Sequence, residues 1–294
     1  LVMVEDAGFE FPQGELNKNL LPFQRDIVQW SLRKGRSAVF ADCGLGKTLM
    51  QLEWGRRVAE HTGGKILLLA PLAVSQQTLA EAGKFNIPNV RVVENQEQCS
   101  DGINVTNYEK LHKFNPESFT GVILDESSIL KSLDGKTRKL ITDAFELTPY
   151  KLACSATPAP NDFMELGSHS EFLNVMSKQE MLAMFFVHDG GRTSNWRLKG
   201  HAQHKFWEWV CTWAVVVRTP SDIGYSDEGF ILPSITFNTK VLEAETPDGM
   251  LFATEAVDIH DQRAARKESL SDRVKACADM ANNSTDQWVI WCNL

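Results

Sequence analysis

One short segment, residues 41–48, constrains the fold of this chain more than any other. It reads Ala-Asp-Cys-Gly-Leu-Gly-Lys-Thr, follows an apolar run and opens a run with helical spacing at residues 47–61. Gly44 and Gly46 permit backbone angles that other residues avoid, so consecutive N–H groups can point at one anion. The helix that follows adds the positive end of its dipole. The segment therefore predicts a phosphate-binding loop between a buried strand and a helix.

A glycine-rich loop that ends in Gly-Lys-Thr in this setting is the Walker A motif. Lys47 would lie as a point charge on the β and γ phosphates of ATP, and the Thr48 hydroxyl would hold Mg²⁺. The backbone of Gly44, Leu45 and Gly46 would surround the phosphates. We therefore expect ATP and Mg²⁺ as cofactors.

The first 155 residues alternate short apolar runs with helical or turn-rich segments. The runs are continuous rather than alternating, as expected for parallel strands covered on both faces. They lie at residues 37–41, 65–70, 90–94, 103–108, 121–125 and 151–155. This rhythm predicts an α/β fold with a doubly wound parallel sheet and helices on both faces.

The fifth of these runs ends in two carboxylates, Asp125 and Glu126. In such a sheet, side chains at the carboxyl end of a strand emerge beside the phosphate loop. Asp125 would hold Mg²⁺, directly or through a water. Glu126 would orient and deprotonate the attacking water. We therefore expect Asp125, Glu126 and Lys47 to form the catalytic set of an ATP hydrolase.

Composition narrows the class of protein only a little. The 294 residues carry a net charge of −8, which argues against a general electrostatic nucleic-acid binder but leaves room for a local basic groove. The six cysteines form no Cys-x-x-Cys pair, as is usual in a reducing cytosol. Neither a membrane helix nor a secretory signal is suggested, so we expect a cytoplasmic location.

Further segments, in the expected order, resemble superfamily-two helicases, especially the Swi/Snf-like branch of DNA translocases and its phage relatives. Gln24, in Leu-Pro-Phe-Gln, is similar to the nucleotide-base motif of that branch, which implies contact with adenine. Ser155-Ala156-Thr157-Pro158 matches the motif that links the ATP site to nucleic acid. Pro71, with Thr106 and Asn107, resembles the family's nucleic-acid-contacting loops.

The resemblance implies a RecA-like P-loop lobe whose ATP hydrolysis drives movement on double-stranded DNA. It also implies a second RecA-like lobe of the same longer chain as a partner, because the family's second lobe supplies an arginine finger. No matching arginine motif occurs before Leu294, so we expect nucleotide binding with weak turnover. The acidic motif departs from the family, since Ser127 and Ser128 can hydrogen-bond but cannot offer the Ser-Ala-Thr segment the histidine contact that the motif of many relatives implies.

We expect four segments along the chain. Residues 1–19 would be an N-terminal extension, 20–160 the ATP-binding lobe, 161–233 a helical elaboration of that lobe, and 234–294 a linker with the truncated start of a second lobe. The elaboration is predicted from helical runs at 163–176, 179–186 and 203–215. Strand-like stretches at 235–242 and 287–292 flank a predicted helix at 264–281.

Two alternative functions stay open at the level of sequence. One is an RNA helicase of the same superfamily, and the other is a nucleotide-switched DNA-binding module without translocation. A P-loop kinase conflicts with Gln24 and the Ser-Ala-Thr segment.

Three side-chain groups outside the motifs are more simply surface or packing residues than sites. A zinc site would use His188, His201, His204 and Cys211. DNA contacts would come from Trp196, Arg197, Lys199, His201 and Lys205, or from Lys131, Lys136, Arg138 and Lys139.

Overall fold

The computed structural model describes residues 5–131, 136–159, 161–188, 196–242 and 258–291, which divide into two compact units, Leu1–Ile231 and Leu232–Leu294. The first unit is built on a seven-stranded sheet in the order β3-β4-β2-β5-β6-β1-β9, and every strand pair in it is parallel. The strands are β1 (Arg36–Ala41), β2 (Lys65–Ala70), β3 (Val90–Val92), β4 (Gly102–Asn107), β5 (Gly121–Leu124), β6 (Tyr150–Cys154) and β9 (Ala214–Val217).

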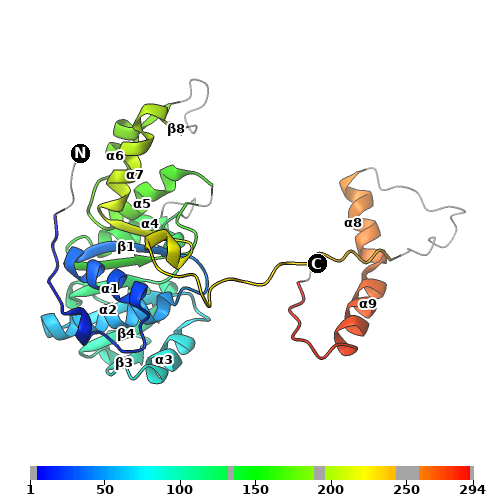
Figure 1. Ribbon diagram of the computed structural model, residues 1–294, viewed down its shortest axis with the longest axis horizontal. Coiled ribbons are helices and arrows are strands. Elements are labelled where there is room, and N and C mark those ends of the chain that lie inside the picture. The colour runs from blue at the N-terminus through cyan, green and yellow to red at the C-terminus, as the bar shows by residue number, and fades with distance from the viewer. Residues whose placement is uncertain (1–4, 132–135, 160, 189–195, 243–257, 292–294) are drawn as a thin grey trace, which may run out of the picture. The chain divides into compact units, whose positions relative to one another are not determined.

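Helices cover both faces of this sheet (Figure 1). On one face lie α1 (Pro22–Lys34), α2 (Lys47–Thr62) and α3 (Ser75–Lys84). On the other lie α4 (Lys136–Ala144), α5 (Leu166–Phe172), α6 (Lys178–Phe185) and α7 (Gln203–Cys211). The strand β2 explains the continuous apolar runs, because Ile66 and Leu68 join the core under α1–α3 while Leu67 and Leu69 join the core under α4–α7. The predicted α/β class is confirmed, and the lobe is RecA-like.

The order of the strands determines where the site lies. The chain leaves β1, passes through α2 and returns as β2 three positions away, so β5 and β6 fill the gap between them. The carboxyl ends of β5, β6 and β1 are therefore neighbours. Residues that follow these three strands meet at one edge of the sheet, as ligand sites do in open α/β sheets.

The helix expected over residues 203–215 was too long. It ends at Cys211, because the β-branched residues that follow form β9 and pair with β1, Val39 opposite Val215. Between α6 and α7 the chain forms a short antiparallel hairpin, β7 (Phe186–His188) with β8 (Trp196–Leu198).

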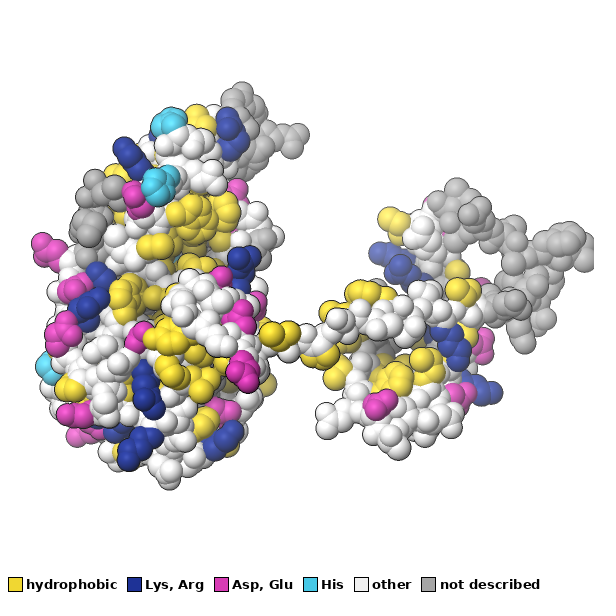
Figure 2. All heavy atoms as spheres, viewed as in Figure 1, with side chains coloured by type: hydrophobic (Ala, Val, Ile, Leu, Met, Phe, Trp, Pro, Cys, Tyr) yellow, Lys and Arg dark blue, Asp and Glu magenta, His cyan; other side chains and the backbone are white. Residues whose placement is uncertain are grey.

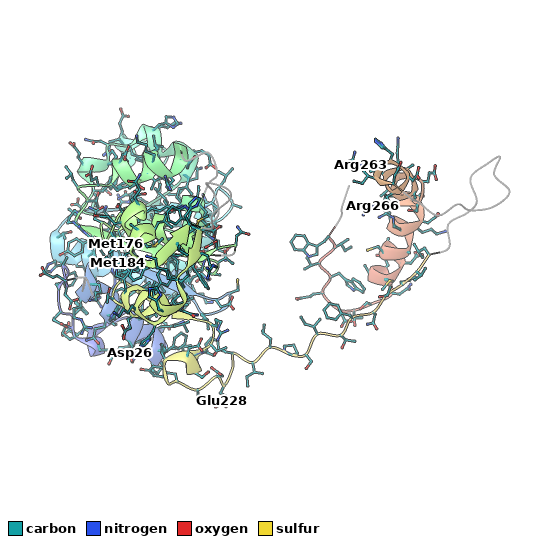
Figure 3. The ribbon with its side chains drawn as sticks, turned by 90° about the horizontal axis from the view of Figure 1, so that it is seen from above. Asp26, Met176, Met184, Glu228, Arg263 and Arg266 are labelled. Atoms are coloured by element: carbon teal, nitrogen blue, oxygen red, sulfur yellow. The ribbon has the colours of Figure 1, made fainter. Side chains whose placement is uncertain are left out.

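The second unit contains α8 (Ile259–Glu268) and α9 (Leu270–Asn282), which stand where one helix over 264–281 was expected. Arg263 and Arg266 extend from α8 (Figure 3). Residues 231–242 and 287–291 are not strands, and their apolar side chains are exposed, as are the yellow ones along the connecting segment in Figure 2. A strand needs a hydrogen-bonded neighbour, and the described part of this unit supplies none. Cys292, the last residue of the expected final strand, lies outside the described residues.

Candidate nucleotide-binding site

The phosphate loop leaves β1 and enters α2 through two glycines in the left-handed region. Gly44 has φ +84° and Gly46 has φ +77°, which residues with a side chain rarely adopt. The Asp42 carboxylate accepts the backbone N–H of Cys43 at 2.6 Å and so fixes the first bend of the loop. A Cβ at Gly46 would lie 2.4 Å from Nε2 of Gln24, so a larger residue there would also displace the Gln24 amide from the loop.

Lys47 is held by the loop itself. Its Nζ donates to the carbonyl oxygen of Ala41 at 2.8 Å and to that of Asp42 at 3.1 Å. Because both acceptors are uncharged carbonyl oxygens, neither neutralises the ammonium, which can still form an ion pair with an incoming anion. Thr48 follows on the same helix and is half-buried. The first turn of α2 therefore presents a cation and a hydroxyl beside the loop.

Gln24 of α1 lies behind the loop, with both ends of its amide engaged. Its Nε2 donates to the Leu45 carbonyl at 2.9 Å, and its Oε1 accepts the Leu21 N–H at 2.8 Å. An amide has two donor hydrogens and two acceptor lone pairs, so each end retains one further hydrogen bond. The expected contact with adenine stays a prediction, while the contact with Leu45 makes Gln24 a support of the phosphate loop.

Asp125 follows β5 and lies next to α2. Its Oδ1 accepts from Nε2 of Gln51 at 2.8 Å, and its backbone carbonyl accepts from the Tyr108 hydroxyl at 2.7 Å. Burial raises the pKa of Asp125, while the hydrogen bond from Gln51 and the charge of Lys47 oppose that shift. The Asp125 carboxylate is half-buried. Together with the Thr48 hydroxyl it offers oxygen ligands, the kind that a hard divalent cation prefers.

Glu126 has φ +53° and turns its carboxylate toward the end of β6. Its Oε1 accepts from Oγ of Ser155 at 2.9 Å and from Oγ of Ser128 at 3.1 Å. Ser155 Oγ in turn accepts the backbone N–H of Thr157 at 3.1 Å. The acidic pair and the Ser-Ala-Thr segment are thus joined directly through the Ser155 hydroxyl, while Ser128 holds the same carboxylate from within the acidic loop.

Several known proteins are similar to part of this chain, although no family model matches it. A 185-residue segment is 29% identical to the SWI/SNF-related matrix-associated actin-dependent regulator of chromatin subfamily A-like protein 1 of Xenopus laevis, covering 56% of this chain and 18% of that protein. A 168-residue segment is 27% identical to the mouse DNA annealing helicase and endonuclease ZRANB3, covering 51% of this chain and 15% of that protein.

The chain is related to the Swi/Snf-like helicases of superfamily two. The Sulfolobus solfataricus SWI2/SNF2 ATPase core in complex with dsDNA has a similar fold, with a TM-score of 0.57 and 20% sequence identity. The similarity covers 72% of this chain and 47% of that chain. The matched part is less than a fifth of each relative with a similar sequence.

The expected nucleic-acid residues of this Swi/Snf-like lobe lie at two places. Pro71 and Asn107 end the neighbouring strands β2 and β4, but Thr106 is buried and Asn107 caps the turn that follows by accepting the Lys110 N–H at 3.1 Å. Ala156 lines an apolar cavity of about 320 Å³ with the ring of Trp207. Their roles stay predictions.

Sequence reasoning missed several residues that hold the Swi/Snf-like site together. Gln51 lies one turn after Lys47, so the spacing of α2 could have placed it on the same face. Lys131 of the turn η5 (Ser127–Lys131) donates to the Thr157 carbonyl, a second link between the acidic loop and the Ser-Ala-Thr segment. His169 of α5 contacts Ser127, and no local pattern indicates this contact across 42 residues.

Of the groups set aside in the sequence, Trp196 and Arg197 line one cavity and Arg138 and Lys139 line another, and contact of these residues with DNA stays untested. Within the described residues no three His, Cys, Asp or Glu side chains are arranged to hold a metal ion. His204 pairs with Glu208 at 3.3 Å on the same helix, and Trp196 packs edge-on against His188 across the hairpin. Among helices in the part of the chain that the structure describes, none is long and apolar enough to cross a membrane.

Proposed function

We propose that this chain is the ATP-binding lobe of a DNA-dependent ATPase that couples ATP hydrolysis to movement on double-stranded DNA. The observation that carries the proposal is the meeting of three strand ends, which brings Lys47, Asp125 and Glu126 to one edge of the sheet. A phosphate loop, a half-buried carboxylate and a second carboxylate oriented by serines are the parts that nucleoside triphosphate hydrolysis requires.

Each residue would have one role. Lys47 would leave the carbonyl oxygens of the loop and bind the β and γ phosphates, which offer it full negative charge in place of two dipoles. Thr48 and Asp125 would hold Mg²⁺, which neutralises charge that develops on the transferred phosphoryl group. Glu126 would accept a proton from the attacking water. Ser155, which is hydrogen-bonded to Glu126, would couple a change at this carboxylate to the residues that contact nucleic acid.

Support for DNA as the track comes from the names of the relatives. The mouse relative is named a DNA annealing helicase, and the Sulfolobus core was solved with double-stranded DNA. A second RecA-like lobe would complete the motor as the partner of this lobe. ATP would then close the two lobes and hydrolysis would reopen them.

Calorimetric titration with Mg-ATP tests the nucleotide site. We expect the unchanged chain to bind, and Lys47→Ala to weaken binding at least about tenfold, since hydrogen bonds to charged groups contribute roughly 1.5–3 kcal/mol. Lys113→Ala removes an exposed lysine outside the site and serves as the matched control. Equal affinity of a folded Lys47→Ala protein and the unchanged chain would refute the assignment of the loop.

The nucleic acid on which the motor moves is tested by phosphate release, measured with duplex DNA, with duplex RNA and without nucleic acid. DNA is expected to stimulate release and RNA is not. Stimulation by RNA alone would favour the RNA helicase. DNA affinity that does not respond to ATP or to Glu126→Gln would favour a binding module without translocation.

A further inference from the structure

The acidic loop has an unusual backbone conformation at its central residue. Glu126 has φ +53°, and a non-glycine residue in the left-handed region is held there by its surroundings at a cost in free energy. The bend is what turns the carboxylate from the line of β5 toward Ser155. Something adjacent must therefore stabilise the bend.

The next residue supplies an anchor. Ser127 is fully buried, and its Oγ lies 3.1 Å from Nε2 of His169. His169 is also fully buried, and its ring packs edge-on against Phe40 of β1 with 5.1 Å between ring centroids. The imidazole thus lies between the strand that leads into the phosphate loop and the loop that carries the acidic pair.

The charge state of His169 fits such an anchor. Burial, and then the charge of Lys131, lowers the pKa of His169 to about 3. The ring is neutral near pH 7 and offers one donor and one acceptor. It can therefore hold the Ser127 hydroxyl without placing a positive charge next to Glu126.

We propose that His169 is a positioning residue for Glu126, acting through Ser127 to hold the left-handed bend that aims the carboxylate. The proposal rests on the ATPase function proposed above. Without the ring, the Ser127 hydroxyl would be buried without this partner, and the backbone at Glu126 would relax toward ordinary angles. Lys47 and Thr48 contact neither residue, so nucleotide affinity would be unaffected.

Four variants of the full chain separate positioning from general support. His169→Leu removes the hydrogen bond but keeps an apolar side chain. His169→Gln keeps an amide group in reach of Ser127, and Ser127→Ala removes the partner. Ser170→Ala is the control, because Ser170 is fully buried on the same helix but donates to the Met176 carbonyl instead.

Three measurements are made on each variant: Mg-ATP affinity by calorimetry, single-turnover hydrolysis with enzyme in excess, and hydrogen exchange of the amides of residues 125–131. His169→Leu and Ser127→Ala are expected to slow hydrolysis about 10- to 100-fold with unchanged affinity, since a small displacement of a catalytic group costs up to about 10²-fold. A further variant that combines His169→Leu with Ser127→Ala should lose no more than either single variant. His169→Gln should recover most of the hydrolysis rate. Amide hydrogen exchange should become faster only in the variants whose hydrolysis rate falls.

Unchanged hydrolysis and exchange in His169→Leu would overturn the proposal. So would an equal loss in Ser170→Ala, or a parallel loss of affinity and rate. If the unchanged chain neither binds nor hydrolyses ATP, the proposed function fails. The amide hydrogen exchange of residues 125–131 then still decides whether His169 holds the loop, because it can be compared between His169→Leu, His169→Gln and Ser170→Ala.

Discussion

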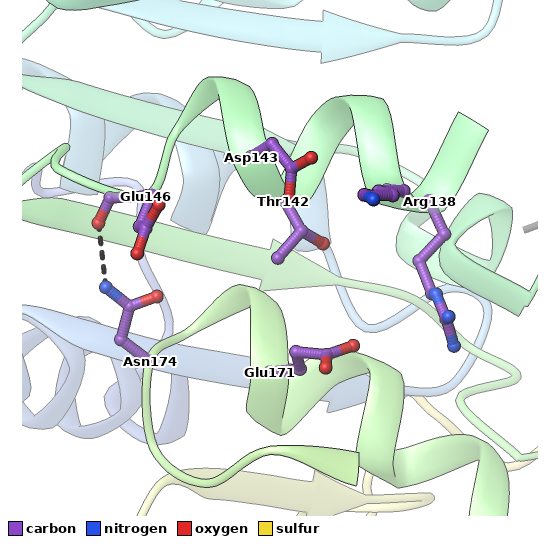
Figure 4. Close-up of a pocket in the computed structure, with 7 residues that line it drawn as sticks. Arg138, Thr142, Asp143, Glu146, Glu171 and Asn174 are labelled. Carbon is purple, nitrogen blue, oxygen red and sulfur yellow. Dashed lines mark hydrogen bonds between the residues drawn. The ribbon is translucent and has the colours of Figure 1, made fainter. Parts of the chain in front are cut away.

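Lys151 is a lysine in the middle of a parallel sheet, fully buried on β6. Its Nζ donates to the Phe172 carbonyl at the end of α5 at 2.9 Å and to Oδ1 of Asn174 at 3.1 Å. Asn174 donates to the Glu146 carbonyl at 2.7 Å, the dashed line in Figure 4, at the edge of a polar cavity of about 310 Å³ between α4 and α5. The lysine thus ties β6 to the end of α5 across the core.

Burial, and then repulsion from Arg36, lowers the pKa of Lys151 to about 7. In the unfolded chain a lysine keeps its proton to about pH 10.4. Above pH 7 the unfolded state therefore binds more protons at this group, so stability rises with pH from about 7 upward and levels off at lower pH, where both states are protonated. We expect urea unfolding between pH 6.5 and 8.5 to show this rise, and Lys151→Met to flatten it. An equal slope in both proteins would contradict the assigned pKa.

The acidic pair gives a second prediction at this scale. Glu126→Gln keeps the size and the hydrogen bonds from Ser155 and Ser128 but cannot accept a proton. Affinity for Mg-ATP should stay within about twofold, while single-turnover hydrolysis should fall on the order of 10²- to 10⁴-fold. A variant that hydrolyses ATP at the normal rate would remove Glu126 from its proposed role.

Among the elements, α2 packs against the sheet, and Gly55 is a point of close contact. A Cβ at Gly55 would lie 3.0 Å from the Cδ1 atoms of Ile103 and Ile123, both fully packed in the core. Alanine would favour the helix by about 1 kcal/mol, but overpacking costs roughly 1–3 kcal/mol. We expect Gly55→Ala to destabilise the lobe by about 1 kcal/mol in urea unfolding.

Gly83 of α3 is the matched control for this prediction. It is exposed, and an added Cβ would meet no atom within 4 Å. Gly83→Ala should therefore stabilise the lobe by up to about 1 kcal/mol, the propensity gain alone. If both substitutions stabilise, the core around α2 is looser than the distances indicate.

At the scale of the whole molecule, the two units differ in how they are stabilised. Both hydrophobic cores lie in Leu1–Ile231, where Phe230 packs edge-on against Phe23 of α1 and the Tyr225 hydroxyl donates to Asp26, labelled in Figure 3. Among the described residues of Leu232–Leu294, no side chain is buried. The free energy of folding must therefore come from the first unit.

A chain that ends at Ile231 should fold with the same melting temperature, within about 2 °C, and bind Mg-ATP with unchanged affinity. The reason is that the residues of both hydrophobic cores lie within Leu1–Ile231. Thermal unfolding and calorimetry of the two proteins provide the measurement. A loss of several degrees would mean that the second unit contributes to the stability of the lobe.

Local pattern determined much of this protein. Apolar runs predicted six of the seven strands of the sheet, because a strand buried on both faces must be apolar throughout. Gly44, Gly46 and Lys47 indicated a phosphate loop, because the conformation and charge of such a loop are properties of consecutive residues. The seventh strand, β9, was taken for a helix end, since its pairing with β1 depends on a segment 170 or more residues away.

Only the tertiary structure decided which side chains act on one another at the site. Asp125, Glu126 and Ser155 end neighbouring strands because β5 and β6 fill the space between β1 and β2, an order that no single segment encodes. His169 reaches Ser127, and Gln24 supports Leu45, across helices whose packing depends on two complete cores. The physical reason is that hydrogen bonds between distant residues form only where burial of many apolar side chains has already brought the backbones together.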